Sequence, residues 1–345
     1  DPLWSRGLGD VYKRQADVAQ LLFHRMPQQA AHLGEGEVGR ELRRGELRGS
    51  CAHGSSIRIA SNSKQCYDSR ITSNSKHPAK GKTMKAVRFH EVGGPEVLHY
   101  EEIDQPTPGA GQVRLRVAAS AFSAADNGMR AGFLPIPVVL PHIPGYDVSG
   151  TVDALGDGVG GFAVGDAVIA FLPMATDGGA AEYVIAPADA LVEAPKSVPL
   201  VDAAGLPSVA LTARQALFDD GGLEAGQRVL IVGAGGVVGK YAIALAKRAG
   251  AHVIATASPR SADAVRAAGA DEIIDHTETD VLDAVTEQVD LLLNLAPIEP
   301  DEFTALVRLV RDGGVVVSTT AWMPAPDDAG RGAVSYTHLT LPTKA

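Results

Sequence analysis

The sequence predicts an α/β protein built from two unlike halves, a β-rich domain over residues 84–205 and a doubly wound domain over residues 206–334. In the first half, short alternating runs such as Val113, Leu115 and Val117 are typical of small antiparallel strands joined by turns. In the second half, apolar runs alternate with helical segments, which is the pattern of a doubly wound parallel sheet. We expect its strands around positions 230 and 253 and over residues 291–295 and 315–317.

The stretch from Arg228 to Ser258 reads as a strand, a glycine turn, a helix and a second strand. Residues 229–232 form the apolar run of a strand buried on both faces, and residues 241–249 carry a helical pattern. Glycines at such a turn let the backbone approach a pyrophosphate, whose charge is stabilised by unpaired N–H groups and the helix dipole. The spacing departs from G-x-G-x-x-G because Val238 stands in the third glycine's place, and a glycine-rich turn without a ligand is the alternative. The turn residues predicted to bind the cofactor are Gly233, Gly235, Gly236, Val237, Val238 and Gly239.

The end of the second strand predicts NADP rather than NAD. A fold that prefers NAD usually has Asp or Glu about 20 residues after the turn, where the carboxylate binds the ribose hydroxyls. This chain has Ser258 and Arg260 there instead, and a hydroxyl and a guanidinium suit a 2′-phosphate. The alternative is that Ser258 only caps the next helix and that Arg260 is a solvated charge in its first turn.

Charge is divided unevenly along the chain. The first 83 residues hold 14 Lys and Arg against 8 Asp and Glu, whereas residues 84–334 hold 16 against 33. An acidic body argues against a nucleic-acid-binding face, and the absence of cysteine from that body suits a cytoplasmic protein without disulfides. No apolar run approaches the roughly 20 residues that a membrane helix needs.

Several motifs follow one another from Met84 to about Val334: MKAVRFHEVGGPEVL, PHIPGYDVSGTV, VGDAVIA, GGAAEYV, LPSVALTARQAL, the glycine turn, and ATASPR followed by GADEIID. In this order they resemble the medium-chain dehydrogenase/reductase superfamily, specifically its zinc-free quinone oxidoreductase branch. The resemblance implies a GroES-like β-rich catalytic domain packed against a Rossmann domain, with substrate and nicotinamide meeting in the cleft between them. It also implies a small-molecule substrate and a homodimeric parent enzyme.

The residues argue against a catalytic zinc, because zinc-dependent relatives need Cys and His ligands. The only cysteines, Cys51 and Cys66, lie outside the resembling region. Where the zinc branch would carry the His and Glu of Gly-His-Glu, this chain has Tyr146 and Asp147. We expect His142 to be a polar loop residue rather than a ligand, and we predict no metal.

Without a metal, polarisation of the substrate must come from hydrogen bonds. Relatives commonly read Asn-Pro-x-Asp where this chain has Ser123 to Asp126, so the resemblance implies a catalytic centre with Ser123 as a hydrogen-bond donor and Asp126 beside it. A structural salt bridge between Asp126 and Arg130 is the alternative. Tyr146 is a candidate proton donor; its alternatives are packing in a family loop and a proton supplied by solvent.

Further cofactor contacts are implied by the resemblance and by the rule that strand carboxyl ends face the cofactor crevice. Thr212 matches a threonine beside the nicotinamide ring, and a helix Thr that bonds its own backbone is the alternative. His276 matches a position near the adenosine phosphate, although a lone His is more often simply exposed. The residues that end the fourth and fifth Rossmann strands complete the set: Asn294, Leu295, Ala296, Ser318 and Thr319.

The two ends of the chain do not resemble the family. DPLWSRGLGDVYKRQ and SYTHLTLPTKA look like translated adapter sequence, and RIASNSK recurs as RITSNSK. We expect residues 1–83 and 335–345 to be extraneous, with a basic disordered arm as the alternative for the first segment. We also expect the Rossmann domain to be truncated near Val334, which would leave an unpaired strand edge and uncovered apolar surface.

Together these observations predict an NADPH-dependent, zinc-independent oxidoreductase that transfers hydride to a quinone, an enone or a carbonyl. The cofactor would supply the chemistry, and the protein would supply orientation and polarisation. The alternative from another class is a non-catalytic NADPH-binding protein, because Ser123 departs from the family's Asn. Turnover with a panel of substrates distinguishes the two.

Overall fold

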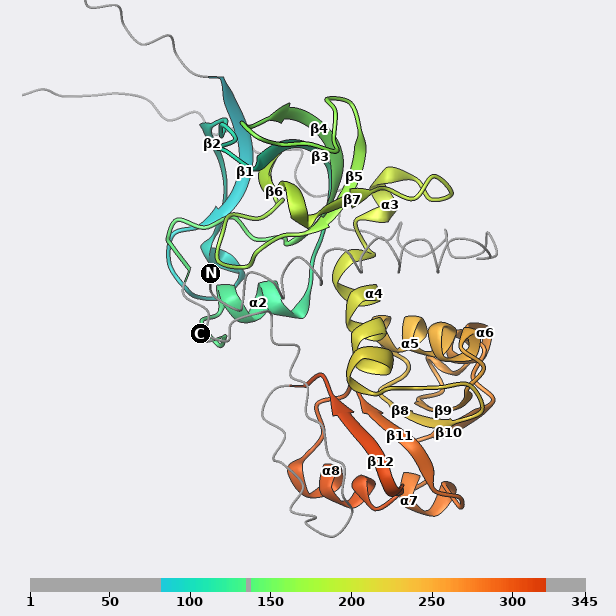
Figure 1. The fold of residues 1–345 in the computed structure, drawn as a ribbon. Helices are drawn as coiled ribbons and strands as arrows, with labels where there is room; N and C mark the ends of the chain where they lie inside the picture. Colours follow the sequence, from blue (N-terminus) through green and yellow to red (C-terminus); the bar gives the residue numbers. More distant parts are fainter. Residues whose placement is uncertain (1–81, 135–137, 321–345) are drawn as a thin grey trace, which may run out of the picture. The chain divides into compact units, whose positions relative to one another are not determined.

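The computed structural model describes residues 82–134 and 138–320. The predictions for the two chain ends, including those for Cys51 and Cys66, therefore fall outside the described residues. The described part contains two five-stranded sheets and a two-stranded ribbon (Figure 1). Among these residues, no helix has the length and apolar character needed to cross a membrane.

The first half is an antiparallel β structure, as its alternating runs predict. In β3, Val113 and Leu115 are fully buried while Arg114 and Arg116 between and after them are not. The sheet order is β6-β3-β4-β5-β7, and β1 pairs with β2 as a separate ribbon. The elements are β1 (Thr83–Phe89), η2 (Pro95–Val97), β2 (Leu98–Asp104), β3 (Gln112–Ala121), α2 (Ala124–Arg130), β4 (Asp147–Leu155), β5 (Ala167–Phe171), β6 (Tyr183–Pro187), η3 (Ala188–Ala190) and β7 (Leu191–Glu193).

The second half is a parallel sheet with the strand order β10-β9-β8-β11-β12. The first strand along the chain, β8, lies in the middle, and the chain crosses over beside it, as in a doubly wound dinucleotide-binding fold. The doubly wound parallel sheet is thus confirmed. After α3 (Leu200–Ala203), which lies before residue 206, the elements are α4 (Pro207–Arg214), η4 (Gln215–Asp220), β8 (Arg228–Val232), α5 (Val237–Arg248), β9 (His252–Ala257), α6 (Ala262–Ala268), β10 (Glu272–Asp275), α7 (Val281–Ala284), β11 (Val289–Asn294), α8 (Pro300–Val307) and β12 (Val310–Ser318).

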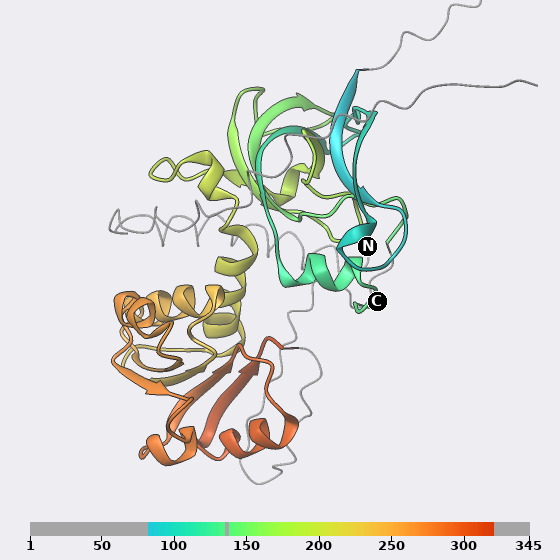
Figure 2. The same cartoon turned by 180° about the vertical axis from the view of Figure 1, so that it is seen from behind.

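Helices cover both faces of the parallel sheet (Figure 2). Val229 and Ile231 of β8 pack into one apolar core with Ile243 of α5, whereas Leu230 packs into the other with Phe303 of α8. Alternate residues of a strand point to opposite faces, so a strand covered on both faces must be apolar throughout. The unbroken apolar run at residues 229–232 follows from this packing.

Two local features differ from the sequence prediction. Helix α5 begins at Val237, four residues before the predicted start at position 241, because the glycine turn leads directly into the helix. Strand β10 was not among the predicted strands. It lies at the edge of the sheet and only Ile274 is buried, so its sequence lacks the apolar run of a central strand.

Candidate functional site

The glycine turn is held between the carboxyl ends of two neighbouring strands. Gly233 follows β8 with a φ of +78°, a backbone conformation that favours glycine. Its N–H donates to the Thr256 hydroxyl of β9 over 2.9 Å. On the other side, a Cβ at Gly233 would lie 3.0 Å from the backbone nitrogen of Ala296, which follows β11. Thr256 is buried and anchors the turn, a role that sequence reasoning missed.

The other glycines allow close contacts with the helices on either side of the turn. A Cβ at Gly235 would overlap the Ser261 hydroxyl, and a Cβ at Gly239 would overlap the carbonyl oxygen of Ala234. Gly239, in the first turn of α5, therefore takes the packing role of the third glycine. The close approach to the Ala234 backbone falls at Gly239, one residue after the place that Val238 occupies in the sequence pattern.

Helix α5 begins without a side-chain cap. Gly236 is its N-cap residue, with φ −73° and ψ 177°, and no side chain accepts a hydrogen bond from the first turn. Val237 at the first helical position is 58 % exposed. The N–H groups at a helix start have no partner within the helix and carry the positive end of the helix dipole. Glycines that admit a close approach and free N–H groups behind them fit the pyrophosphate of a dinucleotide.

The carboxyl end of β9 presents a short polar turn. The Ser261 N–H donates to the Ser258 carbonyl over 2.9 Å, and the Ser258 N–H donates to the Ser261 hydroxyl over 3.2 Å. The N-cap residue of α6 is Ser261. The alternative that Ser258 caps this helix is therefore wrong. Arg260 is exposed and makes no hydrogen bond or ion pair with the described residues, so its guanidinium is free for a ligand.

The ends of β11 and β12 are joined by side-chain hydrogen bonds. The Asn294 side-chain nitrogen donates to the Ser318 hydroxyl over 3.2 Å, and its oxygen accepts from the Ala296 N–H over 3.2 Å. The Asn294 carbonyl accepts from the Thr319 N–H over 3.0 Å. Asn294 and Ser318 are buried and engaged with each other, which suits them to holding this rim in place. That Asn294 and Ser318 contact the cofactor stays a prediction, and so does the contact expected of Leu295.

Two further predicted contacts differ in exposure. Thr212 in α4 is 9 % exposed, and its hydroxyl makes no hydrogen bond to the described residues. The alternative of a helix Thr bonding its own backbone is therefore not observed. His276 is exposed, and its N–H donates to the Ala257 carbonyl at the end of β9 over 3.2 Å. The position of His276 beside the β9 turn is compatible with a contact to the adenosine end of a dinucleotide.

Ser123 and Asp126 form a capping box at the start of α2. The Ser123 hydroxyl donates to Asp126 Oδ2 over 2.8 Å, and the Ser123 N–H donates to the same oxygen over 2.8 Å. The other carboxylate oxygen accepts from the Gly145 N–H over 2.7 Å. The single hydroxyl proton of Ser123 is thus used within the protein, which corrects the expectation of a donor free for substrate. Asp126 is 1 % exposed and joins α2 to the loop before β4.

The alternative of an Asp126–Arg130 salt bridge is wrong. Arg130 donates instead to the Gly93 carbonyl and, over 3.0 Å, to the Asn127 side-chain oxygen. Arg130 is buried and ties the end of α2 to the loop before η2. Asp126 needs no cation because three donors already surround it.

Tyr146 and His142 form a buried pair. The Tyr146 hydroxyl lies 2.6 Å from His142 Nε2, and both residues are 1 % exposed. Burial raises the pKa of Tyr146 above its usual value of 10.0 and lowers the pKa of His142 below 6.5. His142 Nδ1 lies 3.6 Å from Asp177, whose side chain is half exposed. His142 therefore lies in the loop before β4, as predicted, and is buried there. Tyr146 packs in the core of the antiparallel half, which corresponds to its alternative interpretation.

Asp147 is a functional candidate for which sequence reasoning found no partner. The residue is 4 % exposed, and its two carboxylate oxygens accept from the N–H and the hydroxyl of Ser208, each over 2.6 Å. Burial raises the pKa of Asp147 to about 6, although the Ser208 hydrogen bonds oppose this shift. Ser208 lies 61 residues further along the chain, so no local pattern indicates the contact.

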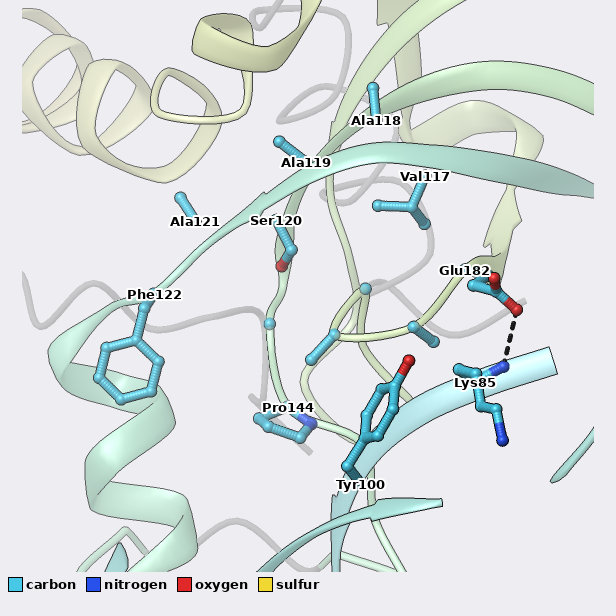
Figure 3. Close-up of a pocket in the computed structure, with 14 residues that line it drawn as sticks. Lys85, Tyr100, Val117, Ala118, Ala119, Ser120, Ala121, Phe122, Pro144 and Glu182 are labelled. Carbon is cyan, nitrogen blue, oxygen red and sulfur yellow. Dashed lines mark hydrogen bonds between the residues drawn. The ribbon is translucent and has the colours of Figure 1, made fainter. Parts of the chain in front are cut away.

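A cavity of about 450 Å³ lies in the antiparallel half; none of the predicted site residues lines it, but Phe122 and Gly145, the chain neighbours of Ser123 and Tyr146, do. Figure 3 shows Ser120 between the exposed rings of Tyr100 and Phe122, with Lys85 and Glu182 at the rim. The Ser120 hydroxyl is buried and has no hydrogen-bond partner in the described part of the chain. The pairing of β3 with β6 stops at Arg116, whereas its pairing with β4 continues to Ala121, so an open strand edge lines this cavity.

Metal ligands do not gather in the part of the chain that the structure describes. No group of three or more His, Cys, Asp or Glu residues there is arranged to hold a metal ion. At the positions that the zinc branch uses, Tyr146 contacts His142 and Asp147 contacts Ser208. The side chains of Tyr146 and Asp147 thus bond other residues of the protein.

The chain matches two protein families. The alcohol dehydrogenase GroES-like domain family matches residues 109–196, and the zinc-binding dehydrogenase family matches residues 237–341. The chloroplast envelope quinone oxidoreductase homolog of Arabidopsis thaliana is 37 % identical over 204 residues, which is 57 % of this chain and 62 % of the relative. The quinone oxidoreductase of Mus musculus is 31 % identical over 245 residues, which is 68 % of this chain and 73 % of the relative. The chain thus spans less than two thirds of the length of the plant relative.

Solved structures show the same fold. The quinone oxidoreductase from Coxiella burnetii has a TM-score of 0.68 at 31 % identity, covering 74 % of this chain and 83 % of that protein. An NAD-dependent alcohol dehydrogenase has a TM-score of 0.67 at 31 % identity, covering 73 % of this chain and 84 % of that protein. The two names differ in activity, so the fold alone does not select a substrate.

Proposed function

Because the chain belongs to the medium-chain dehydrogenase/reductase superfamily, in its quinone oxidoreductase branch, we propose that it is an NADPH-dependent, zinc-independent oxidoreductase that reduces a quinone, an enone or a carbonyl. The family implies a nicotinamide cofactor. In this chain the proposal rests on one observation: the glycine turn after β8 leads into α5, whose first turn has no side-chain cap. That arrangement supplies backbone N–H groups to a pyrophosphate.

The protein's residues would bind and orient both reactants. NADPH, when bound, supplies the hydride. Gly233 and Gly235 would allow the backbone to approach the pyrophosphate, and the unpartnered Thr212 hydroxyl would contact the nicotinamide end. Neither predicted donor presents a free proton to the substrate, because the Ser123 proton is donated to Asp126 and the Tyr146 hydroxyl is buried against His142. Solvent is the proposed proton source.

The preference for NADPH over NADH rests on the end of β9. No carboxylate stands there to repel a 2′-phosphate, Ser258 offers a partly exposed hydroxyl, and Arg260 is exposed without a partner in the described residues. Arg260→Ala should weaken NADPH binding by roughly 1–3 kcal/mol and leave NADH binding nearly unchanged, because only NADPH has the charged group. The matched control is Arg266→Ala, which removes an exposed arginine of α6 that pairs with Asp263. Equal losses for the two cofactors in Arg260→Ala would refute the phosphate assignment.

Substrate class and metal independence are tested by turnover. Full-length protein with NADPH and a panel of quinones, enones and aldehydes should oxidise the cofactor with at least one class. Activity should persist through exhaustive chelation, because the positions of zinc ligands in relatives hold Tyr146 and Asp147 here. Loss of activity that zinc alone restores would overturn the zinc-independent assignment.

A non-catalytic NADPH-binding protein is the second candidate. The capping box favours it, because the Ser123 hydroxyl proton that would polarise a substrate is engaged by Asp126. NADPH binding without turnover on any substrate of the panel would select this candidate.

We further propose a cytoplasmic location and a homodimeric parent enzyme. Sedimentation of the purified protein tests whether it is a dimer.

A further inference from the structure

The Asp147–Ser208 contact joins the antiparallel sheet to helix α4. Asp147 is the first residue of β4, and Ser208 is the second residue of α4. The carboxylate accepts both the backbone N–H and the hydroxyl of Ser208 over 2.6 Å. Backbone N–H groups in the first helical turn lack partners within the helix, and the dipole there favours a negative charge. The carboxylate therefore fixes the first turn of α4 against β4.

The Asp147 carboxylate is buried, and its negative charge there lowers the stability of the folded protein. Ser149, two residues along β4 and on the same face, is fully buried, and its hydroxyl has no hydrogen-bond partner in the described residues. Burial raises the pKa of Asp147 to about 6, and the negative charge of Asp126 on α2 raises it further, against the opposing Ser208 hydrogen bonds. A raised pKa means that the ionised form is the less favoured one in the folded protein. A residue that served stability alone would be better replaced by a neutral group.

Helix α4 also carries the predicted nicotinamide contact. Ser208 and Thr212 are four residues apart and so lie on one face of the helix. Thr212 is 9 % exposed, and its hydroxyl has no hydrogen-bond partner in the described residues. We propose that Asp147 is a positioning residue for cofactor binding, which acts through Ser208 to hold α4 so that the Thr212 hydroxyl stays aligned for the nicotinamide. This inference rests on the proposed function.

The test compares cofactor affinity with stability in the full-length chain. Asp147→Asn should melt at the same or a higher temperature than wild type at pH 7, because it removes a buried charge. Its dissociation constant for NADPH, measured by fluorescence titration, should nevertheless rise about tenfold. Thr212→Ala should weaken binding as well, and the double variant should be no weaker than the worse single variant, since both act through one contact. The control is Asp153→Asn, on the same strand, where the carboxylate pairs with Arg114 in a partly buried ion pair.

A second pair of variants covers the case in which Asp147→Asn does not fold. Ser208→Ala removes the hydroxyl donor and should also weaken NADPH binding, whereas Ser149→Ala removes an unpartnered hydroxyl from the same face of β4 and should bind NADPH as wild type does. Wild-type protein that fails to bind NADPH would overturn the proposed function together with this inference. Normal binding by wild type, Asp147→Asn and Ser208→Ala alike would overturn this inference alone. Lower melting temperatures with unchanged affinity would assign Asp147 to stability and also overturn it.

Discussion

The turn after β8 and the segment at residues 142–147 before β4 use polar groups in opposite ways. In the turn, glycines remove side chains and the start of α5 has no cap, so backbone donors are left without partners. In the segment before β4, each polar group already has a partner: Gly145 bonds Asp126, Tyr146 contacts His142, and Asp147 holds Ser208. The first region is suited to receive a ligand, and the second is suited to keep its own shape.

This difference explains why the sequence predicts the backbone of the turn but not the partners of the side chains before β4. A phosphate-binding turn depends on backbone groups, so a glycine spacing indicates it directly. A catalytic centre depends on side chains whose partners come from elsewhere in the chain. Ser123 and Tyr146 have the right chemistry for catalysis, and the structure gives both of them internal partners.

The largest expected effect comes from removing Asp126 of α2, whose carboxylate accepts from Gly145 in the second region. Asp126→Ala leaves three donors without an acceptor, the buried Gly145 N–H and the partly buried N–H and hydroxyl of Ser123, and should lower the free energy of unfolding by about 4 kcal/mol. Urea denaturation measures it. Asp153→Ala, which breaks an ion pair nearer the surface, should cost about 1 kcal/mol or less. Similar costs for the two variants would show that Asp126 does not organise this region.

A smaller effect is expected in the turn, and it separates packing from ligand binding. Gly239→Ala would push a Cβ into the Ala234 backbone and should lower the free energy of unfolding by about 3 kcal/mol. In Gly236→Ala the added Cβ would lie no nearer than 3.4 Å to its closest neighbour, the Gly233 carbonyl oxygen, so this change at an N-cap position should cost less than about 1 kcal/mol. Thermal and urea melts of the two variants test the prediction. Equal losses would mean that the close approach at Gly239 does not matter.

The capping box predicts an intermediate effect at Ser123. Ser123→Ala should lower the free energy of unfolding by about 1 kcal/mol, because the first turn of α2 loses its cap. Ser123→Asn keeps a capping oxygen and should recover most of that loss. If urea denaturation gives wild type, Ser123→Ala and Ser123→Asn the same free energy of unfolding, the side chain has no capping role.

The smallest expected effect is a pH dependence in which two buried groups oppose each other. The pKa of Asp147 is raised to about 6, so its stabilising contribution is fully present below the ordinary value of 3.8 and is lost as the pH rises through 6. The pKa of His142 is lowered, so its contribution is present above 6.5 and is lost as the pH falls. From pH 7 to pH 5, Asp147 should add about 1 kcal/mol to stability while His142 subtracts.

Asp147→Asn separates these two contributions. Without the titrating carboxylate, only the His142 effect remains over this range, so the variant should lose more stability between pH 7 and pH 5 than wild type does. Denaturant unfolding at the two pH values measures the difference. A variant with the wild-type pH dependence would show that Asp147 does not titrate in this range.

A local sequence pattern predicts part of the side-chain arrangement before β4, the bonds between Ser123 and Asp126. Ser123 and Asp126 have the three-residue spacing of a capping box, a local pattern that predicts their mutual hydrogen bonds. The interpretation as a catalytic donor came from resemblance to relatives with Asn at that position. His142 gave no such signal, because a histidine in a Pro-rich loop looks exposed until the chain folds over it.

The sequence by itself determined the two halves, the central strands of the parallel sheet and the glycine turn, because buried strands need apolar runs and a phosphate turn needs glycine. These requirements act within a few residues along the chain. Only the tertiary structure decided that Gly239 rather than the place of Val238 permits the close packing, and that Asp147 is bonded to Ser208. Such contacts join residues that become neighbours only when strands and helices pack, and spacing along the chain does not encode that distance.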